Sequence, residues 1–182
     1  MKAGKLVKTF TAKDGRKVLL RTFRWEDLDD LQELINSLVE ERAEITRTEK
    51  ASREEEIDWL SGALCRLEKD QTFYLVAEVD GHVVANSEIN RRGGSEKHVG
   101  SIGIAIKNGF RDNGIGTEMM NALVKQAQKM GLKVLTLTCF ATNKRAMHVY
   151  EKVGFVQTGQ IPKKHLREGK YVDEIIMTKP LE

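Results

Sequence analysis

An arginine and two glycines stand directly ahead of an amphipathic helix in the segment that begins at Asn108, NGFRDNGIGTEMMNALVKQAQKMG. A helix N-terminus leaves its first N–H groups unpaired and carries about half a positive charge. Gly114 and Gly116 lack the side chains that would keep a phosphate from the backbone. Arg111 supplies a two-pronged cation, and Thr117 supplies a hydroxyl. This spacing predicts a cradle for a diphosphate.

Two common phosphate motifs are absent from this segment. The dinucleotide fingerprint G-x-G-x-x-G fails because Met119 stands where the third glycine belongs, and the P-loop fails because no Gly-Lys-Ser/Thr follows. A nucleotide-binding protein of another class is therefore disfavoured. Taken alone, the segment is also compatible with a strand–helix turn that binds no ligand.

A second set of polar residues lies in NKRAMHVYEKVGF, which begins at Asn143. Asn143 and Tyr150 are seven residues apart, nearly two helical turns, so they share one face. Ala146 lies between them and leaves room for a thin chain, and Met147 could line the same face. Asn143 also suits a helix N-cap. Tyr150 could instead be a packing residue whose polar tip stays wet.

The periodicity of apolar residues and the turn signals predict the elements that position these residues. Asp14-Gly15 and Asp80-Gly81 are typical of tight hairpin turns. Ser52, with Glu55 three residues later, predicts a capped helix start. The expected strands lie on either side of Asp14-Gly15 within 5–24 and at 72–79, 82–91, 97–106, 133–140, 155–161 and 170–180. The expected helices cover 25–41, 53–69, 117–130 and 143–153.

The strand–helix–strand unit from 101 to 140 predicts one right-handed crossover between parallel neighbours. The other strands follow one another as hairpins. We therefore expect an α/β (α+β) fold, a mixed and mostly antiparallel twisted sheet with flanking helices and one parallel β-α-β junction. The length of 182 residues and the lack of a linker predict one domain, 1–182.

Composition excludes several classes of function. The chain is 40% hydrophobic and 31% charged, with a net charge of +3 and no dense basic stripe, which argues against nucleic acid as the partner. No apolar run is long enough to span a membrane, and MKAGKLVKTF is unlike a secretory signal, so we expect a cytoplasmic protein. The four histidines lack metal-ligand spacing. Cys65 and Cys139 lie in apolar stretches and are expected to be buried free thiols.

The two chemical segments together resemble a known superfamily. The pattern R-x-x-G-x-G after a strand resembles the acetyl-CoA-binding motif of the GNAT (GCN5-related N-acetyltransferase) superfamily, and the later segment is similar to its N-x-x-A-x-x-x-Y-x-x-x-G-F pattern. The resemblance covers nearly the whole chain and is to bacterial or archaeal amine and protein N-acetyltransferases. The matching positions are Arg111, Gly114, Gly116, Asn143, Ala146, Tyr150, Gly154 and Phe155.

The resemblance implies acetyl-CoA as cosubstrate, a possible homodimer and a set of binding residues. Backbone groups of the strand before the loop would pair with the pantetheine arm, loop amides would hold the pyrophosphate, Asn143 would contact the cofactor arm, and Tyr150 would stand near the thioester sulfur. The strand positions are Ile104, Ala105 and Ile106. The loop positions are Arg111, Asp112, Asn113, Gly114, Ile115, Gly116 and Thr117.

The expected mechanism is direct attack of a primary amine on the acetyl thioester. An alkyl ammonium titrates at about 10.4, so a base, a water chain or desolvation must neutralise it first. Tyr150 would act as general acid or hydrogen-bond donor to the leaving thiolate. The backbone N–H of Ile106 would meet the oxyanion.

The general base is sought on the strand beside the cofactor strand. Glu88 is the first candidate, and because Ser87 and Glu88 point to opposite faces, only one of them can reach the cleft. Glu88 could equally be an exposed strand carboxylate. His98 is a weaker candidate, and water alone could serve.

The sequence leaves the acceptor open between a small-molecule amine and a protein N-terminal or lysine amine. VEERAEITRTEK, with Glu40, Glu41 and Glu44, could attract a cation, whereas IPKKHLREGKY is basic and could meet an acidic substrate. Both are also typical of solvated surface. A non-catalytic acyl-CoA-binding regulatory module on the same fold is the alternative function, since a fold does not fix an activity.

Overall fold

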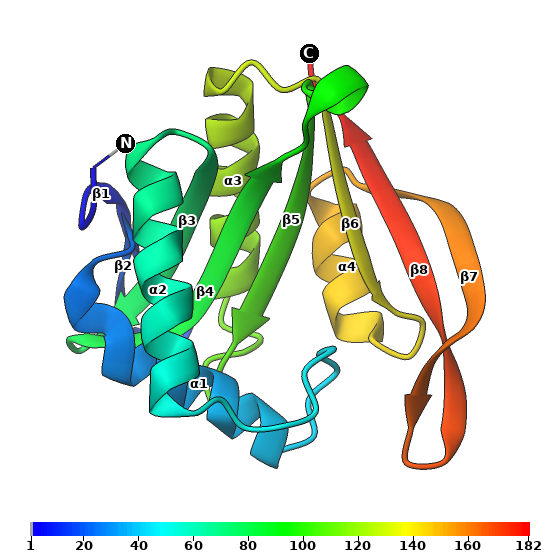
Figure 1. Ribbon diagram of the computed structural model, residues 1–182, viewed down its shortest axis with the longest axis horizontal. Coiled ribbons are helices and arrows are strands. Elements are labelled where there is room, and N and C mark those ends of the chain that lie inside the picture. Colours follow the sequence, from blue (N-terminus) through cyan, green and yellow to red (C-terminus); the bar gives the residue numbers. More distant parts are fainter. Residues whose placement is uncertain (1) are drawn as a thin grey trace.

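The computed structural model describes residues 2–182 and arranges their eight strands in one sheet, in the order β1-β2-β3-β4-β5-β6-β8-β7 (Figure 1). The strands are β1 (Leu6–Thr11), β2 (Lys17–Thr22), β3 (Thr72–Val79), β4 (His82–Arg91), β5 (Val99–Ile106), β6 (Val134–Phe140), β7 (Val156–Arg167) and β8 (Lys170–Pro180). The α-helices are α1 (Leu28–Glu40), α2 (Arg53–Glu68), α3 (Ile115–Lys129) and α4 (Lys144–Lys152).

The pairing of the strands confirms the expected mixed sheet. Strands β1 to β5 pair antiparallel in succession, β6 runs parallel to β5, and β8 pairs antiparallel with both β6 and β7. Both Asp-Gly hairpins are present, and Gly15 (φ +87°) and Gly81 (φ +86°) adopt the left-handed backbone that such turns need. Within residues 2–182 there is therefore a single parallel junction, at the β5-α3-β6 crossover.

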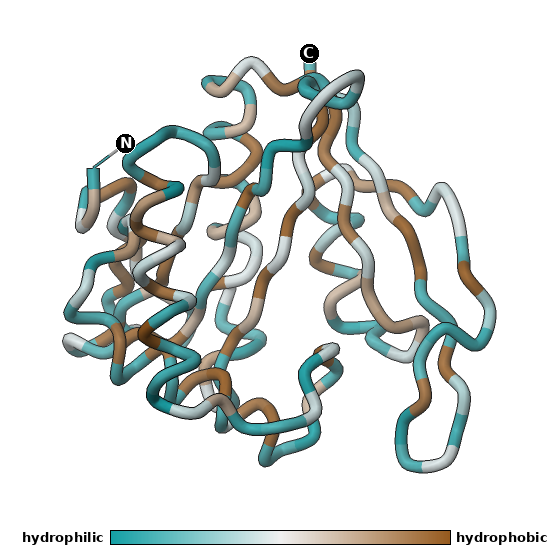
Figure 2. Tube along the Cα trace, viewed as in Figure 1, coloured by the Kyte–Doolittle hydropathy of each residue, from teal (hydrophilic) through white to brown (hydrophobic). Residues whose placement is uncertain are grey.

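The helices cover both faces of the sheet. Figure 1 shows α1 and α2 in front of the sheet and α3 and α4 behind it. Strand β3 is buried along almost its whole length because it is covered on both sides. Figure 2 shows hydrophobic residues along the strands and hydrophilic residues along most of the connections. The predicted Ser52–Glu55 capping box starts α2, and no helix among residues 2–182 is long and apolar enough to cross a membrane.

Two predicted boundaries that bear on the site were wrong. Helix α3 begins at Ile115 and not at Thr117, because Gly114, at φ +86°, forms the N-cap and Ile115 packs in the core at 1% exposure. Strand β7 continues to Arg167 and not to 161, because its pairing with β8 resumes beyond a bulge between Ile161 and His165.

Strands β5 and β6 separate after a short region of contact. They pair only from Val99 to Ser101 on β5 and from Val134 to Thr136 on β6, although β5 runs on to Ile106. Figure 1 shows the two strands diverging below this region. The sheet is therefore split at its parallel junction, where the edges of two strands are left unpaired.

Candidate active site

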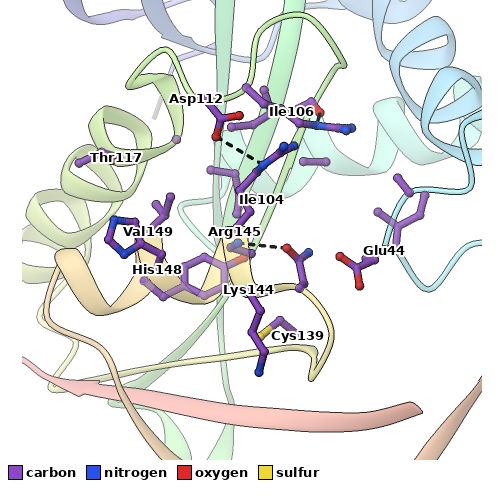
Figure 3. Close-up of a pocket in the computed structure, with 18 of the residues that line it drawn as sticks. Glu44, Ile104, Ile106, Asp112, Thr117, Cys139, Lys144, Arg145, His148 and Val149 are labelled. Atoms are coloured by element: carbon purple, nitrogen blue, oxygen red, sulfur yellow. Dashed lines mark hydrogen bonds and ion pairs between the residues drawn. The ribbon is translucent and has the colours of Figure 1, made fainter. Parts of the chain in front are cut away.

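A cleft of about 1140 Å³ occupies the split between β5 and β6. Its walls are the separated ends of both strands, the glycine loop before α3, the start of α4, and the connection between α1 and α2. Figure 3 shows Glu44 entering from that connection, on the side opposite His148 and Val149 of α4. The cleft brings together residues that lie more than 100 positions apart in the sequence.

The backbone of β5 presents unpaired groups to the cleft. Lys107 N–H donates to the Val84 carbonyl at 2.9 Å, which fixes the alternation of the ladder with β4. Because bonded and non-bonded positions alternate in an antiparallel pair, Ala105 faces β4, whereas the N–H and C=O groups of Ile104 and Ile106 point to the open side. Of the three predicted strand positions, two can therefore offer backbone bonds to an extended ligand.

The N-terminus of α3 opens onto the same cleft. The first intrahelical bond runs from Glu118 N–H to the Gly114 carbonyl, and no side chain caps the helix. The N–H groups of Ile115, Gly116 and Thr117 are therefore without helical partners. A Cβ at Gly116 would lie 3.1 Å from Ile106 Cδ1, closer than most Cβ contacts, so the glycine helps the helix end to lie this close to β5. The geometry is that of an anion site.

Other parts of the loop are held by charged contacts. Arg111 forms an ion pair with Glu41 and donates from Nε to the Ile106 carbonyl at 2.8 Å. Asp112, whose φ is +64°, lies 3.4 Å from Arg145 Nε of α4, as Figure 3 shows. The Asn113 carbonyl accepts from Lys13 N–H at 3.1 Å. The loop is thus fixed to α1, α4 and the first hairpin.

Helix α4 presents Asn143, Ala146 and Tyr150 to the cleft, as their spacing predicted. Asn143 is also the N-cap, and its side-chain oxygen accepts from Ala146 N–H at 3.0 Å. Met147 is not part of the lining; it packs against the hydrophobic core, so that expectation was wrong. The Tyr150 hydroxyl has no hydrogen-bond partner among residues 2–182, although the residue is only 7% exposed.

The thiol of Cys139 lies on β6 near Tyr150, on the cleft wall. Burial, and then the nearby Cys139, raise the pKa of the Tyr150 phenol above its ordinary value, so the hydroxyl stays protonated. Burial raises the pKa of the Cys139 thiol to about 11, with the charges of Glu44 and Glu174 adding to the effect. The expectation of two buried thiols was wrong, because Cys139 is half-buried and Cys65 is exposed on α2.

Glu88 does not line the cleft but lies directly behind it. Its Oε1 is 3.4 Å from the position that a Cβ would take at Gly103, and Gly103 is part of the cleft wall. Burial raises the pKa of Glu88, while Asn90 Nδ2 donates to its carboxylate at 2.9 Å and limits the shift. Ser87 faces the other side of the sheet and donates to the Leu75 carbonyl.

Several lining residues had no signal in the sequence. At the end beyond Tyr150, the wall includes Glu174 of β8, which is 6% exposed and accepts from Lys164 Nζ at 2.9 Å and lies 3.1 Å from His165 Nε2. Burial alone would raise the pKa of Glu174, but these two contacts outweigh it, and the pKa is lowered. His165 and Glu174 come together only through the β7–β8 pairing, which no local motif predicts.

The first hairpin contributes Phe10, Thr11 and Lys13 to the other end of the wall. The sequence predicted this hairpin but gave no sign that it reaches the cleft. Arg145 and His148 lie one and two positions away from the motif residues of α4, and residues so spaced do not share a helical face, so the spacing gave no signal for them.

Comparisons with known proteins agree with this geometry. A family model described as the acetyltransferase (GNAT) family matches residues 26–155. The L-amino acid N-acetyltransferase AaaT of Escherichia coli (strain K12) is 31% identical over 107 residues, which are 58% of this chain and 66% of that protein.

Solved structures share the fold at low sequence identity. An N-acetyltransferase from Staphylococcus aureus Mu50 has a TM-score of 0.82 and 16% identity, over 91% of this chain and 99% of that chain. A GNAT superfamily phosphinothricin acetyltransferase (Pat) from Sinorhizobium meliloti, solved in complex with AcCoA, has a TM-score of 0.80 and 17% identity, over 90% of this chain and 88% of that chain. The chain belongs to the acetyltransferase (GNAT) family and is an N-acetyltransferase that uses acetyl-CoA.

Proposed function

We propose that a primary amine attacks the thioester of acetyl-CoA directly in the cleft and that Tyr150 protonates the departing thiolate. The observation that carries this is the Tyr150 hydroxyl, which opens on the cleft without a protein partner and is held neutral by its raised pKa. A neutral phenol beside a nascent thiolate can donate a proton or a hydrogen bond. A module that only sensed acyl-CoA would have no use for such a donor.

The cofactor would lie along three features that already face one another. The diphosphate sits against the free N–H groups at the start of α3, with Arg111, Asp112 and Asn113 at the rim of the loop. The pantetheine arm runs along β5, where both backbone groups of Ile104 and the N–H of Ile106 are open, and passes Asn143 and Ala146. Because Ile106 lies next to the loop that holds the diphosphate, the thioester at the far end of the arm is closer to Ile104, and the N–H of Ile104 would meet the oxyanion in place of that of Ile106.

Glu88 accepts the amine proton through water in this proposal. Gly103 separates the carboxylate from the cleft and has no side chain, so a water molecule can bridge the two. Because burial raises the pKa of Glu88, it is a better base near neutral pH than an ordinary carboxylate. Positioning of the two substrates accounts for the rest of the rate enhancement.

A small-molecule amine is the acceptor that we propose. The Escherichia coli relative is named for L-amino acids, which supports this choice over a protein amine. The homodimer and the cytoplasmic location expected from the sequence stay predictions.

The test is release of free thiol from acetyl-CoA with a panel of amino acids, polyamines and N-terminal peptides. Acetyl-CoA, but not NAD or ATP, should also raise the melting temperature by mass action. Amine-dependent thiol release that is lost in Tyr150→Phe supports the proposal. Stabilisation by acetyl-CoA with no thiol release for any amine would mean a binding module and would refute it.

A further inference from the structure

A smaller groove of about 350 Å³ opens from the end of the cleft that lies at the α1–α2 connection, away from the glycine loop. We call this the acceptor end, because the acceptor amine would enter there. The two hollows share the wall formed by Leu38, Arg42, Ala43, Ile45, Thr46, Phe140 and His165. The groove runs away from the glycine loop, between the α1–α2 connection and the far part of the β7–β8 hairpin, which face each other at the lower end of the molecule in Figure 1. A molecule whose amine reaches the thioester can therefore extend into it.

The acidic segment VEERAEITRTEK and the basic segment IPKKHLREGKY form opposite walls of this groove. Arg42 and Arg47 come from the acidic segment, and Lys164 and Arg167 come from the basic one. Glu168 is the one carboxylate in the lining. The acidic residues of the first segment lie elsewhere, since Glu41 pairs with Arg111, Glu40 pairs with Lys50, and Glu44 is in the cleft. The groove is thus basic on both sides.

Three of these four cations already have carboxylate partners. Arg42 pairs with Glu168 at 2.7 Å, Arg47 with Glu55 at 2.8 Å, and Lys164 with Glu174 at 2.9 Å. Arg167 has no carboxylate partner anywhere in residues 2–182. Its charge is therefore the one in the groove that the protein leaves uncompensated.

Arg167 is also held in place. Its Nη2 donates to the Arg42 carbonyl at 2.6 Å, and its guanidinium lies 5.1 Å from the centroid of the Phe140 ring. A guanidinium has five N–H donors, and the Arg42 carbonyl takes one of them. A half-buried, oriented guanidinium with free donors is the arrangement that recognises a carboxylate or phosphate in two-pronged fashion.

The junction between groove and cleft has the opposite sign. Glu44 and Glu174 both line the cleft but not the groove; Glu174 is paired with Lys164 and His165, whereas Glu44 has no cationic partner among residues 2–182. Carboxylates at this point favour the approach of an ammonium group, and the groove beyond them favours an anion. The charges therefore match an acceptor that carries a positive amine at one end and a negative group at the other.

We propose that Arg167 is a specificity-determining residue that binds an anionic group of the acceptor, distal to the reacting amine. This rests on the proposed function, because it takes the cleft as the place of acetyl transfer. The acceptor class is a primary amine with a distal carboxylate or phosphate. A free acidic metabolite and a short peptide with an acidic second residue share this chemistry, and the test distinguishes them.

The experiment compares acceptors that differ only in the distal charge. Thiol release from saturating acetyl-CoA is measured with L-glutamate against L-glutamine, and with glycyl-glutamate against glycyl-glutamine. For at least one pair, the acidic member should have a kcat/KM about 10- to 150-fold higher, mainly through KM. The pair that shows the larger ratio identifies the source. Added salt should reduce the ratio because the groove is open to solvent.

The variant Arg167→Gln should bring the ratio to within about threefold of unity, and Arg167→Lys should give an intermediate ratio. Lys163→Gln is the matched control, since it removes the same charge from the same strand at a position that lines neither hollow. Melting temperatures establish that each variant is folded. Equal rates for both members of each pair in the wild type, or a ratio that persists in Arg167→Gln, would overturn the inference.

Binding provides the readout that does not depend on turnover. Calorimetric titration of the same acceptors into the protein saturated with CoA should give tighter binding of the acidic member, and Arg167→Gln should remove the difference. If no amine releases thiol but this difference is found, the proposed function fails, while Arg167 is still shown to bind the distal anionic group. If thiol is released but the acidic and neutral acceptors bind with equal affinity, the inference fails and the proposed function stands.

Discussion

Arg111, at the start of the glycine loop, forms an ion pair with Glu41, the residue that follows α1. The pair joins the loop that faces the diphosphate site to the connection that forms the acceptor end of the cleft. Both side chains are only about a fifth exposed, so neither charge can be left unpaired without a cost. A diphosphate that displaces Glu41 would keep the Arg111 charge paired, which makes an exchange of partners possible.

This exchange predicts opposite effects for the two partners. Arg111→Gln should weaken acetyl-CoA binding about tenfold or more, because it removes a charged donor to the diphosphate. Glu41→Gln should leave the affinity unchanged or improve it a few-fold, because it removes a competitor for the same guanidinium. Calorimetric titration with acetyl-CoA measures both. If the two substitutions weaken acetyl-CoA binding equally, Arg111 only stabilises the loop and does not bind the diphosphate.

Replacement of Tyr150 separates chemistry from binding. Tyr150→Phe should lower kcat roughly 100-fold or more, the usual scale of general acid catalysis, while the dissociation constant of acetyl-CoA changes little. Because the pKa of the phenol is raised, the wild type should show no loss of activity from Tyr150 ionisation up to about pH 10. Tyr171→Phe, on the exposed face of β8, is the control and should behave as wild type. An unchanged kcat in Tyr150→Phe would remove the acid role.

Glu88 should show opposite effects on activity and stability. Its folded-state pKa is raised, so its contribution to stability is present below the ordinary pKa and is lost as pH rises through the folded value. Glu88→Gln should therefore raise the melting temperature at pH 7 to 8 relative to wild type, and less so near pH 4. The same variant should lower kcat/KM roughly 100-fold and lose the acid limb of the pH profile. Full activity with that limb intact would exclude Glu88 as the base.

The two cysteines report on occupancy of the cleft. At pH 7.5, iodoacetamide should alkylate exposed Cys65 first, because Cys139 is half-buried and its thiol pKa of about 11 leaves little thiolate. At pH 9.5, Cys139 should react as well, and saturating acetyl-CoA, which has no free thiol to consume the reagent, should slow that reaction at least tenfold without affecting Cys65. Peptide mass spectrometry measures each rate. If acetyl-CoA leaves the rate at Cys139 unchanged, the pantetheine arm does not pass β6.

Much of the fold was predictable because its signals are local. Asp14-Gly15 and Asp80-Gly81 predict hairpins by their turn geometry. The connection from β5 through α3 to β6 predicts that these two strands run parallel. Tyr150 could be placed on the cleft because the helical period relates it to Asn143. The predicted start of α3 was two residues too late. The left-handed backbone of Gly114 sets the true start, and the φ of a glycine cannot be inferred from the sequence.

The remaining features depend on pairings between distant strands. Glu88 lies behind Gly103 because of the β4–β5 register, and one residue of slip would have turned it to the other face. Arg167 meets Phe140 and the Arg42 carbonyl because β7 continues past its bulge. Charge alone could not tell that the acidic and basic segments face each other. Their opposition is a property of the assembled sheet and not of either segment.

The most direct test is a crystal structure with CoA bound. The pyrophosphate should lie on the N–H groups at the start of α3, the pantetheine amides should bond to the backbone of Ile104 and Ile106, and the sulfur should lie within hydrogen-bonding distance of the Tyr150 hydroxyl. CoA bound outside the split between β5 and β6, or with its sulfur on the far side of the cleft from Tyr150, would contradict the proposed mechanism.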